Sequence, residues 1–368
     1  MISLSDNNGE VRKIQFTGRS TYILSLPKKW MQEMNLKPGD PVSVIREANS
    51  SLSIIPRAER GSNLANEATA IISEKESVSS LQRKVISIYL SGYNTIHLKS
   101  KTGRINPAQR DAVREVIRRN LVGTEIIADS LDLITIQVLL TLPELSVNTA
   151  ARRMFLIASS MHKDAMLALG EKNYELAKAV IKSDDEVDRF SLYILRNLTI
   201  ATQNERVLRE IGLKNTADCL SYRVAVKSIE RIADHSFGIA EKCLKIEEQQ
   251  KISKGLFDKI EKMSHLSLAV FNDSVEAFLR RDYVMADSVA DRVENIRSVE
   301  NDIISFLNKE DKMASHEPIN SNIRLILEDI RRTAEHASDI AEAAMNQTIG
   351  EVITVERKPT TASYEKAS

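Results

Sequence analysis

The C-terminal half of the chain repeats itself, and this repeat constrains the fold more than any other feature. Moving the sequence by 109 positions places Met154 on Met263 and Tyr174 on Tyr283. Moving it by 101 positions places residues 222–244 on residues 323–345, with 8 of 23 positions identical. A repeat of this length predicts two copies of one supersecondary unit. The offset changes between the second and third predicted helices, where a shorter connection fits.

Apolar residues at helical spacing predict three long helices in each copy. The predicted helices cover residues 145–169, 174–202 and 216–246, and then 256–278, 283–306 and 319–346. We therefore expect two tandem all-α three-helix bundles, over residues 143–248 and 251–349. Residues 350–368, which contain Pro359, are expected to form a disordered tail.

The first part of the chain, residues 9–57, has the pattern of short strands. Alternating apolar residues are separated by turn signals such as Pro38-Gly39-Asp40 and Asn49-Ser50-Ser51. Pro27 is expected to open one helical turn between the strands. Four short strands cannot bury enough surface to be stable alone. We therefore expect an intertwined homodimer in which two copies close a small β-barrel.

Residues 62–142 predict a small α/β connector module. Helical spacing covers 78–90 and 108–119, and strand-like segments occupy 94–99, 123–128 and 133–140. Taken together, the fold class is mixed and multidomain: an N-terminal β-barrel, an α/β linker module and two helical bundles.

The charge of the chain is balanced overall but unevenly distributed. Lys plus Arg number 51 and Asp plus Glu number 51, which excludes a uniformly basic nucleic-acid coat. Residues 10–60 nevertheless carry a net charge of +4. Such a basic segment is typical of phosphate contacts in nucleic-acid binding. The candidate DNA-binding residues are Arg12, Lys13, Arg19, Lys28 and Lys29. A solvated barrel surface that serves only dimerisation is the alternative.

Pairs of carboxylates on neighbouring helices predict a metal site in the first bundle. Glu230 and Asp234 are four residues apart, as are Asp184 and Asp188, so each pair shares a helix face. Asp184 falls within the apolar stripe of its helix, where a carboxylate needs a cation or hydrogen bonds. With His235 nearby, these residues suit an oxygen-rich metal site. A solvated acidic face, paired with Arg189, Arg223 or Arg231, is the alternative.

The second copy departs from this acidic pattern. Val293 stands opposite Asp184, and two arginines, Arg297 and Arg331, stand opposite Asp188 and Glu230. The weaker ligand candidates that remain in this copy are Glu294, Glu335 and His336. We expect the second bundle to bind no metal, or to bind it much more weakly.

Several other classes of protein find no support in the sequence. No Ser/His/Asp or Cys/His arrangement and no phosphate-binding glycine loop can be identified, so we expect no enzymatic activity. No apolar run reaches the length of a membrane span. The two cysteines, Cys219 and Cys243, have no C-x-x-C spacing, and a reducing cytoplasm is the simplest expectation.

Both ends of the chain resemble known families. Residues 12–14 (RKI), 25–30 (SLPKKW) and 36–42 (LKPGDPV) resemble the AbrB/SpoVT/MazE swapped-hairpin family. Residues 229–235 (IERIADH) and 239–241 (IAE), together with the acidic motif of 184–188 (DDEVD), resemble the PhoU family of phosphate-uptake regulators. The whole chain looks like an archaeal-type fusion of the two.

The resemblance implies a function for each half. The swapped barrel implies two-fold DNA binding. The PhoU-like half implies a transition metal, iron or zinc, at the acidic motifs and a role in repressing phosphate uptake. It also implies a phosphate ABC transporter or its signalling proteins as partners. We therefore expect a cytoplasmic, dimeric, DNA-binding transcriptional regulator of phosphate uptake. The alternative is an interaction module that docks on such a partner without binding DNA, its barrel serving only dimerisation.

Overall fold

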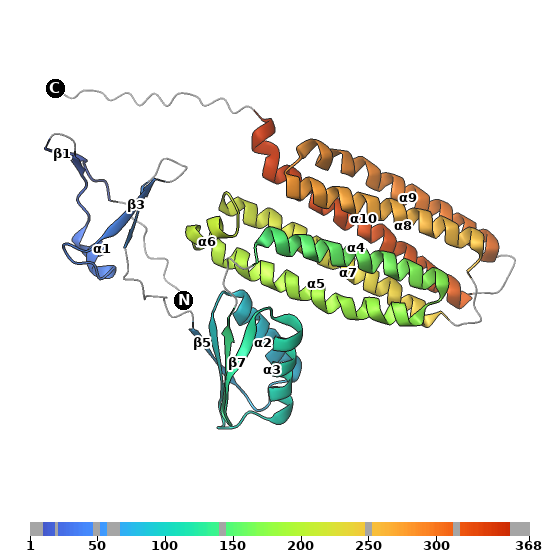
Figure 1. Cartoon of the computed structure of the whole chain (residues 1–368), viewed down its shortest axis with the longest axis horizontal. Coiled ribbons are helices and arrows are strands. Elements are labelled where there is room, and N and C mark those ends of the chain that lie inside the picture. Colours follow the sequence, from blue (N-terminus) through green and yellow to red (C-terminus); the bar gives the residue numbers. More distant parts are fainter. Residues whose placement is uncertain are drawn as a thin grey trace. The chain divides into compact units, whose positions relative to one another are not determined.

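The structure is a computed structural model of the chain, and it describes residues 10–18, 21–46, 52–56, 67–139, 145–246, 252–311 and 317–353 (Figure 1). The predicted DNA-contact residue Arg19 lies outside these ranges, as does the tail beyond residue 353. The chain divides into two compact units, residues 1–65 and residues 66–368. No helix among the described residues is both long and apolar enough to cross a membrane.

The N-terminal unit contains two separate hairpins and one short helix. Strand β1 (Gln15–Thr17) pairs antiparallel with β2 (Thr21–Ile23), and β3 (Val42–Arg46) pairs antiparallel with β4 (Leu52–Pro56). Helix α1 (Lys28–Glu33) follows Pro27, as the sequence predicted. The small strands are thus confirmed, but the two sheets do not close on each other within one chain. The predicted swapped-hairpin barrel is not confirmed.

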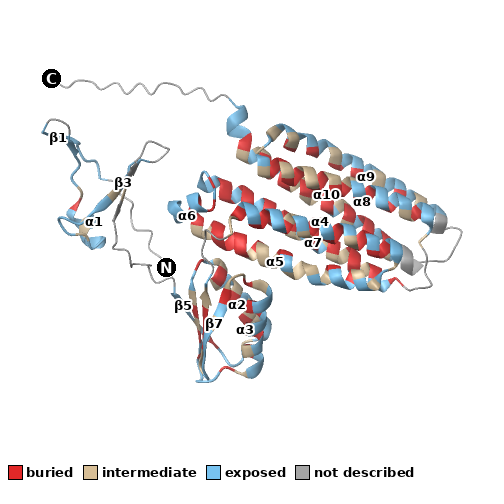
Figure 2. Ribbon diagram, in the orientation of Figure 1, coloured by how far each residue is buried: buried red, intermediate tan, exposed pale blue. Residues whose placement is uncertain are grey.

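The strands of this unit leave their apolar side chains in solvent. Phe16 is 58% exposed, Tyr22 72% and Val44 61%. Figure 2 shows the same unit almost entirely in the colour of exposed residues. Strands of three to five residues cannot cover such side chains within one copy.

The second unit begins with a four-stranded sheet covered by two helices. Its elements in chain order are β5 (Glu67–Ile72), α2 (Val78–Leu90), β6 (Thr95–Ser100), α3 (Pro107–Asn120), β7 (Thr124–Asp129) and β8 (Leu133–Val138). The strand order is β5-β6-β8-β7, with β5 and β6 parallel and the other neighbours antiparallel. Alternate residues, among them Ile96, Leu98 and Ile136, face α2 and α3 and form the core of this α/β module.

Long helices form the rest of the unit. The first repeat consists of α4 (Val147–Glu171), α5 (Tyr174–Ala201) and α7 (Thr216–Lys245), with the short α6 (Glu205–Glu210) between the last two. The second repeat consists of α8 (Lys254–Arg280), α9 (Tyr283–Asp311) and α10 (Glu317–Val352). The three long helices of each repeat contact one another, so each repeat forms a three-helix bundle. The predicted helical half is confirmed.

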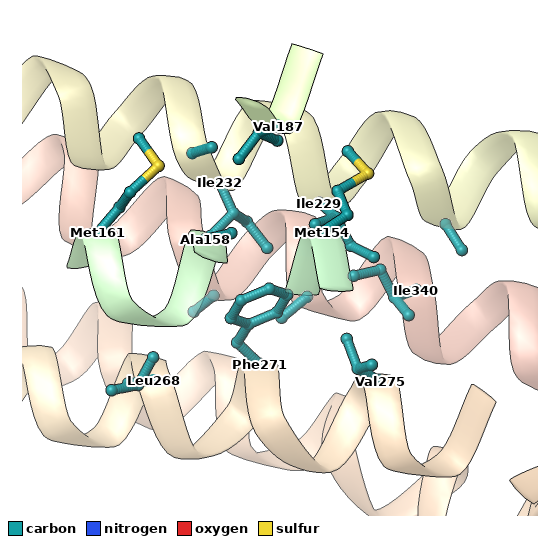
Figure 3. Close-up of a cluster of buried hydrophobic side chains, with 14 of the residues drawn as sticks. Met154, Ala158, Met161, Val187, Ile229, Ile232, Leu268, Phe271, Val275 and Ile340 are labelled. Carbon is teal, nitrogen blue, oxygen red and sulfur yellow. The ribbon is translucent and has the colours of Figure 1, made fainter. Parts of the chain in front are cut away.

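The two bundles share one hydrophobic core. Side chains from both repeats belong to a single cluster that runs through α4, α5, α7, α8, α9 and α10. Figure 3 shows Met154, Ile229 and Ile232 of the first repeat in one cluster with Phe271 and Ile340 of the second. The ring of Phe155 packs edge-on against that of Phe271, with centroids 5.1 Å apart. Neither bundle could be separated from the other without exposing this core.

Equivalent positions of the two repeats end their first helices in the same way. Lys172 and Arg281 both adopt the left-handed backbone conformation, with φ of 56° and 59°, at the C-termini of α4 and α8. This conformation is a common way to end a helix, and it is unfavourable for residues with a Cβ. The repeated sequence therefore encodes a repeated backbone.

The α/β module is fixed to the first bundle through α5. The Arg196 guanidinium is buried, and it donates hydrogen bonds to the carbonyl oxygens of Tyr89 and Gly92 and to Asn94 Oδ1. It also lies 4.8 Å from the centroid of the Tyr89 ring. A Cβ on Gly92 would lie 2.9 Å from Cγ1 of Ile200, so this turn must be glycine for close packing on α5.

The structure adds two elements that the sequence did not predict, β5 and α6. It also extends the last helix, because α10 continues to Val352 and so into the segment expected to be a disordered tail. The rest of that tail cannot be compared, since residues 354–368 lie outside the described part of the chain.

Candidate functional site

Four predicted ligand residues come close to one another on the neighbouring helices α5 and α7. Asp184 and Asp188 lie on α5, and Glu230 and Asp234 lie on α7. Asp184 and Asp188 are half-buried, and Asp184 Oδ1 is enclosed without a hydrogen-bond partner among the described residues. These four residues, which we call the acidic cluster, therefore lie near the surface of the bundle rather than in its core.

Burial and mutual repulsion make these carboxylates reluctant to ionise. The pKa of Asp184 is raised to about 7, chiefly by burial and in part by the charges of Asp188 and Asp234. Burial likewise raises the pKa of Asp188 to about 6, with Glu230 adding to the shift. The pKa of Asp234 is also raised, chiefly by burial. Such a set of carboxylates lacks the positive charge that would compensate it.

Positively charged side chains balance the charge of the acidic cluster only in part. Lys227 forms an ion pair with Glu230 on the same helix. In the described part of the chain, no ion pair joins Arg189, Arg223 or Arg231 to the four carboxylates, although the sequence offered these arginines as partners. Lys227 is a partner that the sequence analysis missed, and its position three residues before Glu230 was the available signal.

The negative charge of the acidic cluster suits a cation, but the present positions of its carboxylates do not. Within the described ranges, no three His, Cys, Asp or Glu side chains converge closely enough to hold a metal ion. The uncompensated oxygen of Asp184 and the raised pKa values are what a bound cation would correct. Binding would therefore require the carboxylates to change rotamer.

The Nδ1 atom of the predicted ligand His235 does not contact the acidic cluster. That nitrogen lies 3.0 Å from Asp329 Oδ1, on α10 of the second repeat. Its ring stacks on that of His336, with centroids 5.5 Å apart and planes at 17°. His336 Nδ1 lies 3.1 Å from Asp339 Oδ2. The two histidines are equivalent residues of the two repeats, so their stack marks the boundary where α7 meets α10.

Asp329 is an inter-repeat contact that sequence reasoning missed. Besides contacting His235, it accepts a hydrogen bond from Lys242 Nζ at 2.8 Å. A Cβ on Gly238 would lie 3.0 Å from Asp329 Oδ2, so glycine makes room for this contact. Sequence separation hid the partnership, because the residues are distant in the chain.

In the second repeat, arginines supply the positive charge that compensates the equivalent carboxylate. Glu335 accepts hydrogen bonds from Arg297 at 3.1 Å and from Arg331, and Arg331 also contacts Glu300 at 3.0 Å. Burial opposes ionisation of Glu335, but these hydrogen bonds outweigh it and lower its pKa. Glu294, the remaining weaker candidate, is exposed and lies 3.4 Å from Arg297. The two repeats thus hold carboxylates at equivalent places in opposite electrostatic states.

One contact connects the α/β module to the acidic motif. Arg119 of α3 forms two hydrogen bonds from Nη2 to Asp185, at 2.8 and 3.0 Å, and a third from Nε at 3.2 Å. Asp185 directly follows Asp184 on α5. The module therefore contacts the helix that carries two of the four residues of the acidic cluster.

The described DNA-contact candidates are exposed in the N-terminal unit. Arg12, Lys13, Lys28 and Lys29 all lie in solvent. Arg12 pairs with Glu10, and Lys29 lies 3.9 Å from Glu33 across one helical turn. No ion pair holds Lys13 or Lys28 among the described residues of this unit.

Comparisons with known proteins agree with this division of the chain. The family described as "PhoU domain" matches residues 151–243 and again residues 260–344. The family described as "Antidote-toxin recognition MazE, bacterial antitoxin" matches residues 15–62. The chain is therefore a PhoU-domain protein with two copies of that domain and an N-terminal domain of the MazE/AbrB-like type.

Individual relatives match about half of this chain. The chain is similar to the "Phosphate-specific transport system accessory protein PhoU homolog 1" of Thermotoga maritima, with 27% identity over 199 residues, 52% of this chain and 81% of the relative. The "Phosphate-specific transport system accessory protein PhoU homolog" of Caulobacter vibrioides is 26% identical over 217 residues, 56% of this chain and 87% of the relative.

A solved structure supports the fold. PhoU from Pseudomonas aeruginosa matches with a TM-score of 0.50 and 20% identity, over 55% of this chain and 96% of that one. At this identity the likeness concerns the arrangement of helices alone.

Proposed function

We propose that the protein is a DNA-binding regulator of phosphate uptake. The observation that carries the proposal is the joining of two kinds of domain in one chain: two PhoU domains, and a MazE/AbrB-like domain with exposed basic residues. The relatives of the helical half are named as accessory proteins of phosphate-specific transport. A basic domain attached to such a half would bring its regulatory state to DNA.

DNA contact is assigned to Arg12, Lys13, Arg19, Lys28 and Lys29. The four that are described are exposed and can reach phosphate oxygens. Contacts of this kind position a protein on DNA without specifying its sequence. Any sequence preference therefore has to come from other contacts or from the shape of the duplex.

The proposal includes a homodimer formed through the N-terminal unit. The exposed apolar side chains of the two hairpins, such as Phe16 and Val44, need a cover that one copy does not supply. A second copy would supply it and would place two equal basic faces on DNA.

The proposal also includes a transition metal bound by the acidic cluster of the first bundle. Asp184, Asp188, Glu230 and Asp234 would hold it after a change of rotamer, and iron or zinc would supply the missing positive charge. His235 could contribute only through Nε2, since Nδ1 faces Asp329. No such site is assigned to the second bundle, where Arg297 and Arg331 occupy the equivalent positions.

Metal analysis of the full chain tests this assignment, because the shared core prevents separation of the bundles. We expect the purified protein to contain metal, and we expect Asp184→Asn combined with Glu230→Gln to remove it. The control, Glu335→Gln, changes the carboxylate of the second repeat that corresponds to Asp234 and should leave the metal content unchanged. Equal losses in both variants would contradict a site confined to the first bundle.

A second candidate function is an interaction module that does not bind DNA. It is favoured by the fact that the curated relatives match only about half of this chain, and that they are named as accessories of a transport system. In this case the bundles would dock on a phosphate ABC transporter or its signalling proteins, and the N-terminal unit would only dimerise.

A gel shift distinguishes the two candidates. The probe is promoter DNA of phosphate-transport genes from the same genome, at low salt, where phosphate contacts are strongest. The DNA-binding proposal predicts a shifted band that Lys28→Ala combined with Lys29→Ala weakens. No shift at any protein concentration would leave the interaction module as the better account.

A further inference from the structure

The α/β module contains a cleft that neither the metal nor the DNA proposal uses. It lies beside the start of α3, is open to solvent and has a volume of about 560 Å³. Its wall contains Arg104, Arg110 and Arg114, together with Asp111 and Asp129. Ile105, Pro107 and Leu131 supply apolar surface. A volume of this size suits a small organic ligand, since ligand pockets are commonly about 300–1,000 Å³.

One side of the cleft is a loop that is held in place before any ligand arrives. The hydroxyl of Ser100 donates a hydrogen bond to the Arg104 carbonyl oxygen at 2.8 Å and accepts from the Arg104 amide at 3.1 Å. The amide of Ile105 donates to the Leu131 carbonyl oxygen at 2.8 Å. Arg104 is thus presented from a fixed backbone, which reduces the entropy lost on binding.

The arginines differ in how far they are already paired. Arg110 contacts Asp129 and donates to the Ser130 carbonyl oxygen at 2.8 Å. Arg114 reaches Asp129 at 2.9 Å and Asp111 at 3.2 Å. Two carboxylates therefore serve two arginines, and the exposed guanidinium of Arg104 has no ion pair or hydrogen bond within the described ranges. The cleft retains one positive charge in excess.

We propose that this cleft binds a small molecule that carries a phosphate monoester on an organic body, such as a nucleotide monophosphate. A guanidinium with free N–H groups matches the geometry of phosphate oxygens and can bind two of them at once. Arg104 contacts the phosphate, with the half-exposed Arg114 beside it. The apolar surface of Pro107 and Leu131 covers the organic body. The proposal goes beyond the proposed function and does not depend on DNA or metal binding.

Calorimetric titration of the full chain tests the proposal with four probes: adenosine monophosphate, ribose 5-phosphate, inorganic phosphate and adenosine. We expect the nucleotide to bind with Kd below about 1 mM. Inorganic phosphate and adenosine, which each lack one half of the ligand, should bind at least about tenfold more weakly. If inorganic phosphate binds as tightly as the nucleotide, or if neither phosphate ester binds, the proposal is wrong.

Two variants place the binding in the cleft. Arg104→Ala removes an unpaired side chain from an exposed loop, so it should fold normally and weaken nucleotide binding at least about tenfold. The control, Arg118→Ala, removes an exposed arginine from the other end of α3 and should leave the Kd unchanged. Equal weakening by both variants would show general charge attraction instead of a site, and would overturn the assignment.

Discussion

At the scale of single residues, the two repeats differ most clearly at one position. Asp184 in the first repeat stands where the second repeat has Val293, which is 9% exposed. The carboxyl at this place has a pKa raised to about 7 by burial and by its acidic neighbours. The residue is unfavourable for the fold unless a cation compensates it, which is the pattern expected where function overrides stability.

The substitution Asp184→Val should therefore stabilise the metal-free protein. Removing a poorly compensated carboxylate from the acidic cluster should raise the free energy of unfolding by about 1–2 kcal/mol. Urea unfolding in the presence of a chelator measures the change. As control, Asp185→Val removes a carboxylate that Arg119 already pairs, and it should bring no gain. A loss of stability in Asp184→Val would count against an uncompensated charge.

His162 predicts a pH dependence of stability. It is fully buried in α4, with Nε2 2.8 Å from Ser264 Oγ of α8, and burial lowers its pKa to about 4. The unfolded chain, with a histidine pKa near 6.5, binds the proton more readily, so stability falls as the pH falls from about 6.5 toward 4. The raised pKa values of Asp184 and Asp188 act in the opposite direction, so a variant is needed to isolate the histidine.

Chemical unfolding of the wild type and of His162→Gln at pH 7 and pH 5 makes that comparison. The wild type should lose about 2 kcal/mol more than the variant between these pH values. Glutamine does not titrate, while it can still hydrogen-bond to Ser264. Parallel pH curves for the two proteins would show that His162 is not the source.

At the scale of elements, Arg196 is the contact that fixes the α/β module to α5. It is 4% exposed and satisfies two backbone carbonyl oxygens of the module. Arg196→Leu removes the side-chain donor to the Gly92 carbonyl oxygen and one of the donors to the Tyr89 carbonyl oxygen, which also accepts from the Gly92 amide. The loss of these charge-assisted hydrogen bonds should destabilise the module by about 3 kcal/mol. Hydrogen exchange should then be faster in α2 and β6 than in α4.

The matched control for Arg196 is another arginine of the first bundle. Arg206 lies on α6, its side chain is 84% exposed, and among the described residues its one ion pair is with Glu210. Arg206→Leu should change the stability by less than about 0.5 kcal/mol, as is usual for exposed ion pairs. Faster exchange of α2 in both variants would contradict a specific role for Arg196.

Local signals in the sequence were sufficient for most elements. The repeat, the helical spacing and turn residues such as Pro27 and Gly92 predicted the long helices and most of the strands. Strand β5 was missed because its residues 67–72 include small alanines with weak strand preference, and it is ordered by its non-local pairing with β6. Helix α6 was missed because its six residues are too few for a periodic pattern.

The candidate site was predictable in its residues but not in its geometry. Spacing on the helices predicted the pairs Asp184 with Asp188 and Glu230 with Asp234, because residues four apart share a face. Metal binding by these residues stays a prediction. Spacing could not show that His235 faces Asp329, since that contact depends on how α7 crosses α10. It also could not show Arg119 against Asp185, which joins separate parts of the fold.

At the scale of the whole molecule, the N-terminal unit predicts self-association. Val44→Asp places a charge on an apolar side chain of β3 that is 61% exposed in one copy. We expect the variant to be monomeric by light scattering and to lose DNA binding, because a buried unpaired charge would oppose the dimer. The control, Leu156→Asp, changes a side chain on α4 that is 59% exposed and should remain dimeric. A dimeric Val44→Asp chain would show that this surface is not the interface.

The salt dependence of DNA binding tests the central claim most directly. Fluorescence anisotropy with phosphate-transport promoter DNA, over about 50–200 mM salt, gives the slope of log affinity against log salt. The account predicts tight binding at low salt, a steep negative slope, and a shallower slope when Lys28→Ala and Lys29→Ala remove two phosphate contacts per chain. Absence of binding at the lowest salt, or a slope that these two substitutions leave unchanged, would contradict it.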